Sequence, residues 1–199
     1  SGDRIEAVLD AGSGVKMEFV KVKPGTFTLG ASSDARKVIL TREFLIQSTE
    51  VTQDQWAAIM GTNPSYFRGG NLPVEQISWY DAIEFIERLN LRLAVWSAAL
   101  PSVAQWECAC RAGSKWDWGA AESQEALAEF AWLPKNSGEK THPVGALKPN
   151  AWGLFDMQGN IWEFCWDWMA PVPSTPELTD PVGPATSKYK LFKGGGWNQ

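Results

Sequence analysis

Apolar and polar residues alternate along the first part of the chain, and this pattern predicts short strands. Within residues 15–30, every second position from Val15 to Phe19 is apolar, as expected for a half-buried strand. Pro24-Gly25 follows as a turn signal, so we expect residues 15–30 to form a hairpin. Residues 36–51 contain another strand-like run. The pattern therefore predicts that the chain begins with β-structure.

Three helices are predicted by their first turns. Each start is a Ser or Thr followed three residues later by an amide or acid, the arrangement of a capping box; the caps are Thr52, Ser78 and Ser102. Apolar residues recur at helical spacing behind the second start, which predicts one buried face. Gly61 and Gly113 are expected to end the first and third helices, because glycine readily adopts left-handed backbone angles.

Regular patterns are sparse from residue 114 to the last residue, where Gly, Pro, Asn and Trp dominate. So long an irregular segment is unusual unless it is functional or tied down internally. The chain contains 12 Trp residues, and large flat side chains of this kind can cover loops that lack regular ladders. We therefore expect one domain that is rich in irregular structure.

Length and charge narrow the class of protein. The 199 residues suit one sizeable domain, and 44% hydrophobic with 21% charged residues is typical of a folded, soluble chain. The net charge is −5 without a basic stripe, so nucleic acid is not an expected partner. No apolar run reaches the roughly 18 residues that a membrane span needs.

The N-terminus does not indicate a compartment. It lacks the layout of a signal peptide, and Ser1-Gly2 is typical of a cloning scar, so a targeting segment could have been removed. Localisation stays open, with an extracytoplasmic or cell-surface location favoured if such a segment existed.

The three cysteines and the single histidine limit the available chemistry. An odd count argues against a disulfide framework, and Cys108 and Cys110 lie on different faces of one predicted helix. One histidine, His142, cannot build an iron facial triad, and without a Cys-x-x-Cys motif a zinc site is not expected. We expect His142 to be a hydrogen-bonding loop residue and the cysteines, including Cys165, to be small buried side chains.

Six segments in order resemble one family. They are EVTQDQW, NPSYF, NLPVEQISWYDAIEFIERLN, LPSVAQWECACRAG, THPVGALKPNAWGLFDMQGNIWEFCWDW and GGGWN. Together they resemble the formylglycine-generating-enzyme, or sulfatase-modifying-factor, family. The resemblance implies an α+β domain with a variant of the C-type lectin fold and little regular secondary structure. Residues 1–14 would be an N-terminal extension and 15–199 a single domain, expected to be C-terminally incomplete because family members continue past the GGSW-type strand.

The family is functionally mixed, and the resemblance alone leaves several functions open. Some members are copper-dependent oxidases that make formylglycine, some are iron enzymes of sulfur chemistry, and others are non-catalytic binding domains. The last group includes the variable proteins of diversity-generating retroelements. The oxidases carry a cysteine pair after the GGSW-type strand, and none of the three cysteines here matches that pair.

We therefore expect a non-catalytic ligand-binding or display protein, such as a retroelement variable protein, without copper or iron. The alternatives are a truncated or departed formylglycine-generating oxidase and a regulatory partner domain. The expected ligand is a protein or a glycan, and the expected oligomeric state is a monomer.

The resemblance also implies a calcium site in the stretch DMQGNIWE. The ligands would be the carboxylates of Asp156 and Glu163 and the main-chain carbonyls of Gly159 and Ile161, a mixture of hard oxygens that suits calcium. Gly159 is expected to adopt backbone angles that other residues avoid. The alternative is a turn without metal, in which Glu163 caps backbone N–H groups. The family's second calcium motif is not matched, so one ion at most is expected.

The aromatic residues near this turn divide into two groups. Trp162 and Trp166 are expected in the core. Trp168, Trp197 and the adjacent Asn198 are the candidate ligand-binding residues, with core packing as the alternative for the two Trp side chains. Aromatic side chains in a shallow groove suit a peptide or sugar ligand.

Overall fold

The computed structural model describes residues 9–10, 14–30, 35–116, 119–171 and 174–198. Its strands are β1 (Leu9–Asp10), β2 (Lys16–Met17), β3 (Phe19–Val22), β4 (Gly25–Leu29), β5 (Arg36–Leu40), β6 (Phe44–Gln47), β7 (Glu163–Trp168), β8 (Glu177–Thr179) and β9 (Lys190–Lys193). Its helices are α1 (Gln53–Met60), α2 (Trp79–Asn90), α3 (Val103–Arg111) and the 3-10 helix η2 (Ala126–Glu129).

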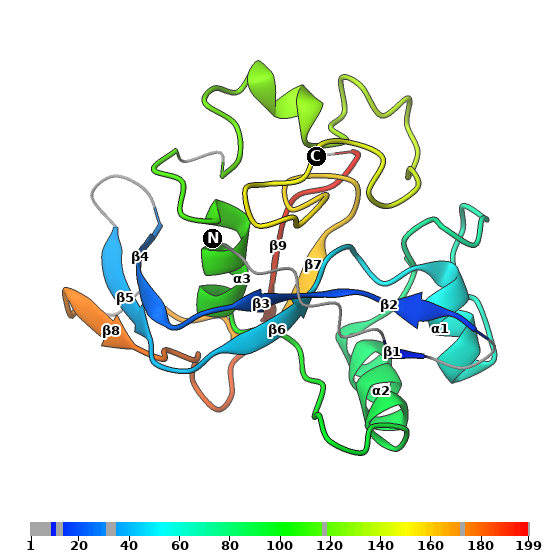
Figure 1. The fold of residues 1–199 in the computed structure, drawn as a ribbon, viewed down its shortest axis with the longest axis horizontal. Coiled ribbons are helices and arrows are strands. Elements are labelled where there is room, and N and C mark those ends of the chain that lie inside the picture. Colours follow the sequence, from blue (N-terminus) through cyan, green and yellow to red (C-terminus); the bar gives the residue numbers. More distant parts are fainter. Residues whose placement is uncertain (1–8, 11–13, 31–34, 117–118, 172–173, 199) are drawn as a thin grey trace.

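One long bent ribbon spans the molecule. β3 pairs with β6 and β4 pairs with β5, both antiparallel, and Figure 1 shows the two pairs following each other across the fold. The hairpin expected within residues 15–30 is therefore wrong, because Pro24 bends the chain from one pair into the next instead of reversing it. The segment from Leu40 to Phe44 contains one residue more than the segment from Val22 to Gly25 with which it pairs at both ends. A β-bulge produces such an offset.

The three predicted helix starts are confirmed. Thr52, Ser78 and Ser102 each accept a hydrogen bond from the backbone three residues on, and the side chain at that position returns one. Gly61 ends α1 with a φ of 76°, as expected. α3 ends one residue earlier than predicted, because Ala112 already adopts a left-handed conformation before Gly113.

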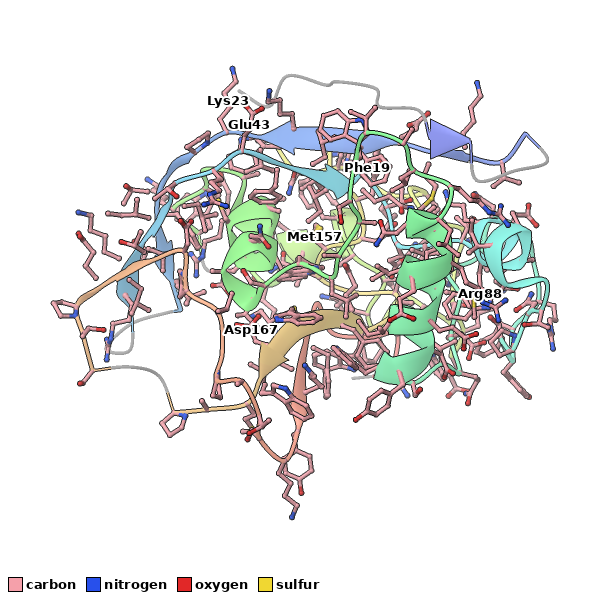
Figure 2. The ribbon with its side chains drawn as sticks, turned by 90° about the horizontal axis from the view of Figure 1, so that it is seen from below. Phe19, Lys23, Glu43, Arg88, Met157 and Asp167 are labelled. Atoms are coloured by element: carbon pink, nitrogen blue, oxygen red, sulfur yellow. The ribbon has the colours of Figure 1, made fainter. Side chains whose placement is uncertain are left out.

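The core consists of several buried clusters. Trp56 of α1 stacks on Phe85 of α2 with ring centroids 5.1 Å apart. A second cluster joins Trp106 of α3 to Leu154, Met157 and other residues of the irregular half, and includes both Cys110 and Cys165. Figure 2 shows Met157 in the interior of the molecule. The buried positions of Cys110 and Cys165 confirm the expectation for those two side chains, while Cys108 is half-buried.

The late part of the chain contains strands that the sequence pattern did not reveal. β7 and β9 pair antiparallel, and β8 joins β5 in parallel. β7 buries Cys165 and Asp167 and turns Trp166 outward. The expected core positions of Trp162 and Trp166 are therefore wrong: they are 41% and 49% exposed, because alternate residues of this extended segment face opposite sides.

No helix among the described residues has the length and apolar composition needed to cross a membrane.

Candidate functional site

Asn160 is the centre of the turn that connects the irregular segments before β7. Its side chain is fully buried; Nδ2 donates to Glu50 Oε2 at 2.8 Å and to the His142 carbonyl at 3.1 Å, and Oδ1 accepts from His142 N at 2.9 Å. The Asn160 backbone bonds to Trp132 and to Trp197. Asn160 has a φ of 61°, in the left-handed region that Asn tolerates better than most residues.

Glu50 contacts this turn from a distant part of the chain, and sequence reasoning missed it. It follows β6 and is buried, and its Oε1 accepts from Ile161 N at 3.0 Å. Glu50 thus caps the backbone of the turn, whereas Glu163 accepts from the indole Nε1 of Trp106 at 3.1 Å. Glu50 and Ile161 are 111 residues apart along the chain, so no local pattern points from one to the other.

The three carboxylates of this region repel one another. Burial, followed by the charges of Asp156 and Glu163, raises the pKa of Glu50 well above its ordinary value. Burial also raises the pKa of Glu163 to about 7 and the pKa of Asp156 in the same direction. Asp156 Oδ2 accepts from Gly145 N at 2.7 Å, but its buried Oδ1 has no protein partner. A bound cation would offset this concentration of negative charge.

A second feature lies on the outer side of β7 and β9, and we call it the Lys190 cage. The ammonium of Lys190 lies 3.9 Å from the ring centre of Trp79, 4.1 Å from that of Trp168 and 5.1 Å from that of Trp166. It also donates to the Trp166 carbonyl at 2.7 Å. Partial burial lowers the pKa of Lys190, an effect that the charge of Asp167 opposes. Indole faces attract cations in this range.

Exposed aromatic and apolar side chains lie next to the cage. Tyr80 packs edge-on against Trp79 at 5.5 Å and is 71% exposed. Met169 and Tyr189, which are joined by a backbone hydrogen bond, are 53% and 56% exposed. Tyr80 and the cage together offer flat apolar surfaces around the Lys190 ammonium.

A comparison with known families identifies the fold that carries these two features. The family described as "Sulfatase-modifying factor enzyme 1-like domain" matches residues 10–199. The chain belongs to this sulfatase-modifying-factor family. The predicted α+β fold, the formylglycine-generating-enzyme type of the C-type lectin fold, is thereby confirmed.

Individual relatives differ in their printed roles. The chain is 31% identical to the "Chaperone protein LppX" of Paenibacillus barcinonensis, covering 92% of this chain and 79% of the relative. It is 33% identical to the formylglycine-generating enzyme of Mus musculus over 71% of this chain, but spans only 40% of that enzyme. Among solved structures it is similar to "Treponema denticola variable protein 1", with a TM-score of 0.89 and 30% identity over 96% of this chain and 87% of the other.

The turn of this sulfatase-modifying-factor domain offers oxygen donors of the kind that a hard cation binds. The orphaned Asp156 Oδ1 is such a donor, and the carbonyls of Met157 and Ile161 converge on Gly194, each 3.6 Å from where a Cβ would lie. No group of three His, Cys, Asp or Glu side chains in the described ranges is arranged to hold a metal, so main-chain oxygens would have to complete the shell, as calcium allows.

Gly159 is required for a different reason from the one expected. Its φ is not in the left-handed region; Asp156 and Asn160 on either side adopt it instead. A Cβ at Gly159 would lie 2.4 Å from the Trp132 carbonyl oxygen and 2.8 Å from the Trp132 nitrogen. The glycine therefore permits the close approach of two backbone segments.

The remaining candidate residues occupy separate places. Trp168 lies opposite Lys190 at one end of the β7–β9 ladder, whereas Trp197 follows Lys193 beyond the other end. Trp197 is half-buried, packs edge-on against Phe67 at 5.8 Å and accepts a hydrogen bond from Ser137 Oγ through its carbonyl. The structure thus does not bring Trp168 and Trp197 together; Asn198, next to Trp197, is exposed.

His142 and the cysteines of this family member are built into the fold. His142 stacks on Trp132 at 3.7 Å and its Nε2 lies 2.6 Å from the Ser137 carbonyl, which confirms it as a hydrogen-bonding loop residue. Burial raises the pKa of Cys108 to about 11 and that of Cys110 to about 12, and also raises the pKa of Cys165. These thiols are protonated at neutral pH, whereas the thiolate is the form that binds metal.

Proposed function

We propose that this domain is a non-catalytic ligand-binding or display protein of the variable-protein kind, and that its ligand contacts the Lys190 cage. The exposed aromatic face is the observation that carries the proposal. The likeness of the chain to a Treponema denticola variable protein supports the same class of function. Within this class, we propose the variable protein of a diversity-generating retroelement as the closest description.

The cage suits a protein or glycan ligand. Trp166 and Tyr80 are exposed flat surfaces on which an apolar peptide side chain or the face of a sugar ring can pack. The Lys190 ammonium has three donors, and the Trp166 carbonyl takes one of them. The others suit an acceptor oxygen of the ligand, which would fix its orientation over the rings.

The thiols favour binding over oxidase chemistry. A copper(I) site needs soft thiolate ligands, and the high pKa values of Cys108 and Cys110 oppose thiolate formation. The runner-up function, a truncated or departed formylglycine-generating oxidase, is supported by the identity to the mouse enzyme, but none of the described thiols has a lowered pKa.

We also propose one calcium ion at the turn before β7. The Asp156 and Glu163 carboxylates and the Gly159 and Ile161 carbonyls would hold it, and Glu50 would orient the backbone that presents them. The ion would neutralise buried negative charge and stabilise the fold.

The ligand proposal is tested by binding to a glycan array and to a displayed peptide library. We expect clones or glycans that bind the wild-type domain to lose at least tenfold in affinity with Trp166→Ala or Trp168→Ala. Trp96→Ala is the matched control, because Trp96 is 61% exposed and is not part of the cage. If the cage variants and the control bind every selected ligand equally, the ligand does not use this face.

A further inference from the structure

A basic cavity lies on a different part of the molecule, where the β3–β4 bend approaches the end of α3. Its volume is about 560 Å³, and four of its lining residues carry positive charge: Lys21, Lys23, Arg111 and Lys115. None of the described residues that line it is acidic. Figure 2 shows Lys23, in the bend between β3 and β4, beside Glu43.

The charge of the cavity is opposite to that of the whole chain. The chain carries a net charge of −5, yet residues from two separate segments bring cations to one concave surface. Concave walls of low dielectric focus the field of such charges and attract counter-ions. The cavity is therefore a local region of positive potential, which attracts anions, on a protein of net negative charge.

The side chains of Glu43, Glu107 and Trp116, which contact three of these cations, do not line the cavity. Lys21 pairs with Glu43 at 2.7 Å, but the Glu43 side chain is 59% exposed, where solvent weakens an ion pair. Arg111 is fixed by Glu107 at 3.1 Å and by the Gly30 carbonyl at 2.9 Å, which holds its guanidinium at the wall. The Lys115 ammonium lies over the Trp116 ring at 4.7 Å.

Carbonyl groups at the end of α3 are hydrogen-bonded within the protein, so they do not present unpaired oxygens to an anion. The Cys108 carbonyl accepts from Ala112 N at 3.1 Å, and the Arg111 carbonyl accepts from Ser114 N at 2.7 Å. At Gly113 no atom lies within 4 Å of where a Cβ would be, so a ligand can approach this backbone closely.

Two aromatic residues complete the wall. Phe27 and Trp152 line the same cavity and are half-buried, so it offers apolar surface next to the cationic groups. Its volume lies within the roughly 300–1,000 Å³ of small-molecule sites. We propose that this cavity binds a small organic phosphoryl anion, with the phosphoryl groups among the lysines and the flat organic part against Phe27 and Trp152. This site is independent of the Lys190 cage and goes beyond the proposed function.

Isothermal titration calorimetry at low salt, with four probes, tests the proposal. ATP carries charge and a flat ring, tripolyphosphate carries charge alone, adenosine carries the ring alone, and citrate is a carboxylate anion. We expect ATP to bind most tightly, tripolyphosphate more weakly, and citrate and adenosine at least tenfold more weakly than ATP. Citrate binding as tightly as tripolyphosphate, or no ATP binding, overturns the proposal.

Two double variants and the alkylation of Cys108 test whether ATP binds in the cavity. Lys23→Ala with Lys115→Ala should weaken ATP at least tenfold, whereas Lys16→Ala with Lys140→Ala, an equal charge change at exposed positions outside the cavity, should weaken it less than twofold. ATP should also slow alkylation of Cys108, the half-buried cysteine that lines the cavity. Equal loss in both double variants, or unchanged Cys108 alkylation, shows that ATP binds elsewhere.

Discussion

At the scale of single residues, the turn before β7 depends on the hydrogen bonds of one amide side chain and on one close approach of two backbone segments. Asn160 satisfies both halves of its amide within the protein, and Gly159 lets the Trp132 backbone pass at close range. A larger side chain at Gly159 has to displace main chain, which is costlier than moving a side chain.

Gly159→Ala should lower the free energy of unfolding by about 3 kcal/mol, because its methyl group would overlap the Trp132 backbone. The control is Gly25→Ala, since no atom lies within 4 Å of the added group and its φ is not left-handed. We expect that variant to change stability by less than about 1 kcal/mol. Urea denaturation of both variants measures the difference, and equal stabilities would show that the turn can relax around the methyl group.

Calcium should raise the melting temperature of the wild-type domain through Asp156 and Glu163. A hundredfold excess over Kd adds about 2.7 kcal/mol, or roughly 5–10 °C for a domain of this size. Glu163→Gln keeps the shape of the side chain and removes its charge, so the shift between calcium and chelator should shrink sharply. If the wild type melts at the same temperature in both buffers, hydrogen bonds alone hold the turn.

At the scale of elements, Glu107 joins α3 to two strands. Its carboxylate accepts from Gly30 N, at the end of β4, and pairs with Lys193 of β9 at 2.8 Å and with Arg111 at 3.1 Å. Burial acts to raise the pKa of Glu107, but the Lys193 charge and these hydrogen bonds outweigh it and hold the pKa below the ordinary value.

The stabilisation by Glu107 should therefore depend on pH. It is fully present above the unfolded pKa of about 4.5 and is lost as the pH falls through the lower folded value. Glu107→Gln should cost about 2 kcal/mol at pH 7 and much less near pH 3. Glu177→Gln, which removes a half-exposed pair with Lys37, should cost under about 1 kcal/mol at either pH. Denaturation at the two pH values compares them, and a pH-independent cost of Glu107→Gln contradicts the argument.

The elements also show what sequence could and could not predict. The helices were predicted because each capping box is a local signal within four residues, as at Ser102 and Gln105. β7 was missed because its inward face holds a charged residue, Asp167, whose carboxylate accepts from Val103 N and Gly183 N. The strand therefore lacks the apolar alternation by which strands are found.

At the scale of the whole molecule, the family and fold followed from six ordered segments, but the composition of the candidate sites did not. Asp156 and Glu163 were chosen by resemblance, whereas Glu50 and the Lys190 cage arise from contacts between distant segments. Trp79 and Lys190 lie in different halves of the chain. They meet because Lys190 pairs into the β7–β9 ladder and Trp79 Nε1 donates to the Cys165 carbonyl of β7 at 3.0 Å.

The whole domain should not oxidise a cysteine peptide. We expect the turnover of a Cys-x-Pro-x-Arg peptide, with or without added copper, to equal the no-enzyme rate, because the pKa values of the described thiols are raised and keep them protonated. Mass spectrometry of the peptide measures the product, and a formylglycine-generating enzyme serves as the positive control. Turnover that a copper chelator abolishes would instead assign the domain to the oxidases.

The contact between Glu50 and the Asn160 turn also bears on how the chain reaches its native state. The two partners are 110 residues apart, so a large loop must close before the contact can form, and such closure slows folding. The bent ribbon and the capped helices involve near neighbours and can form early. The turn before β7 would then be the last part of the chain to fold and the first to unfold. We therefore expect the backbone amide of Asn160 to exchange with solvent before the amides of the helices.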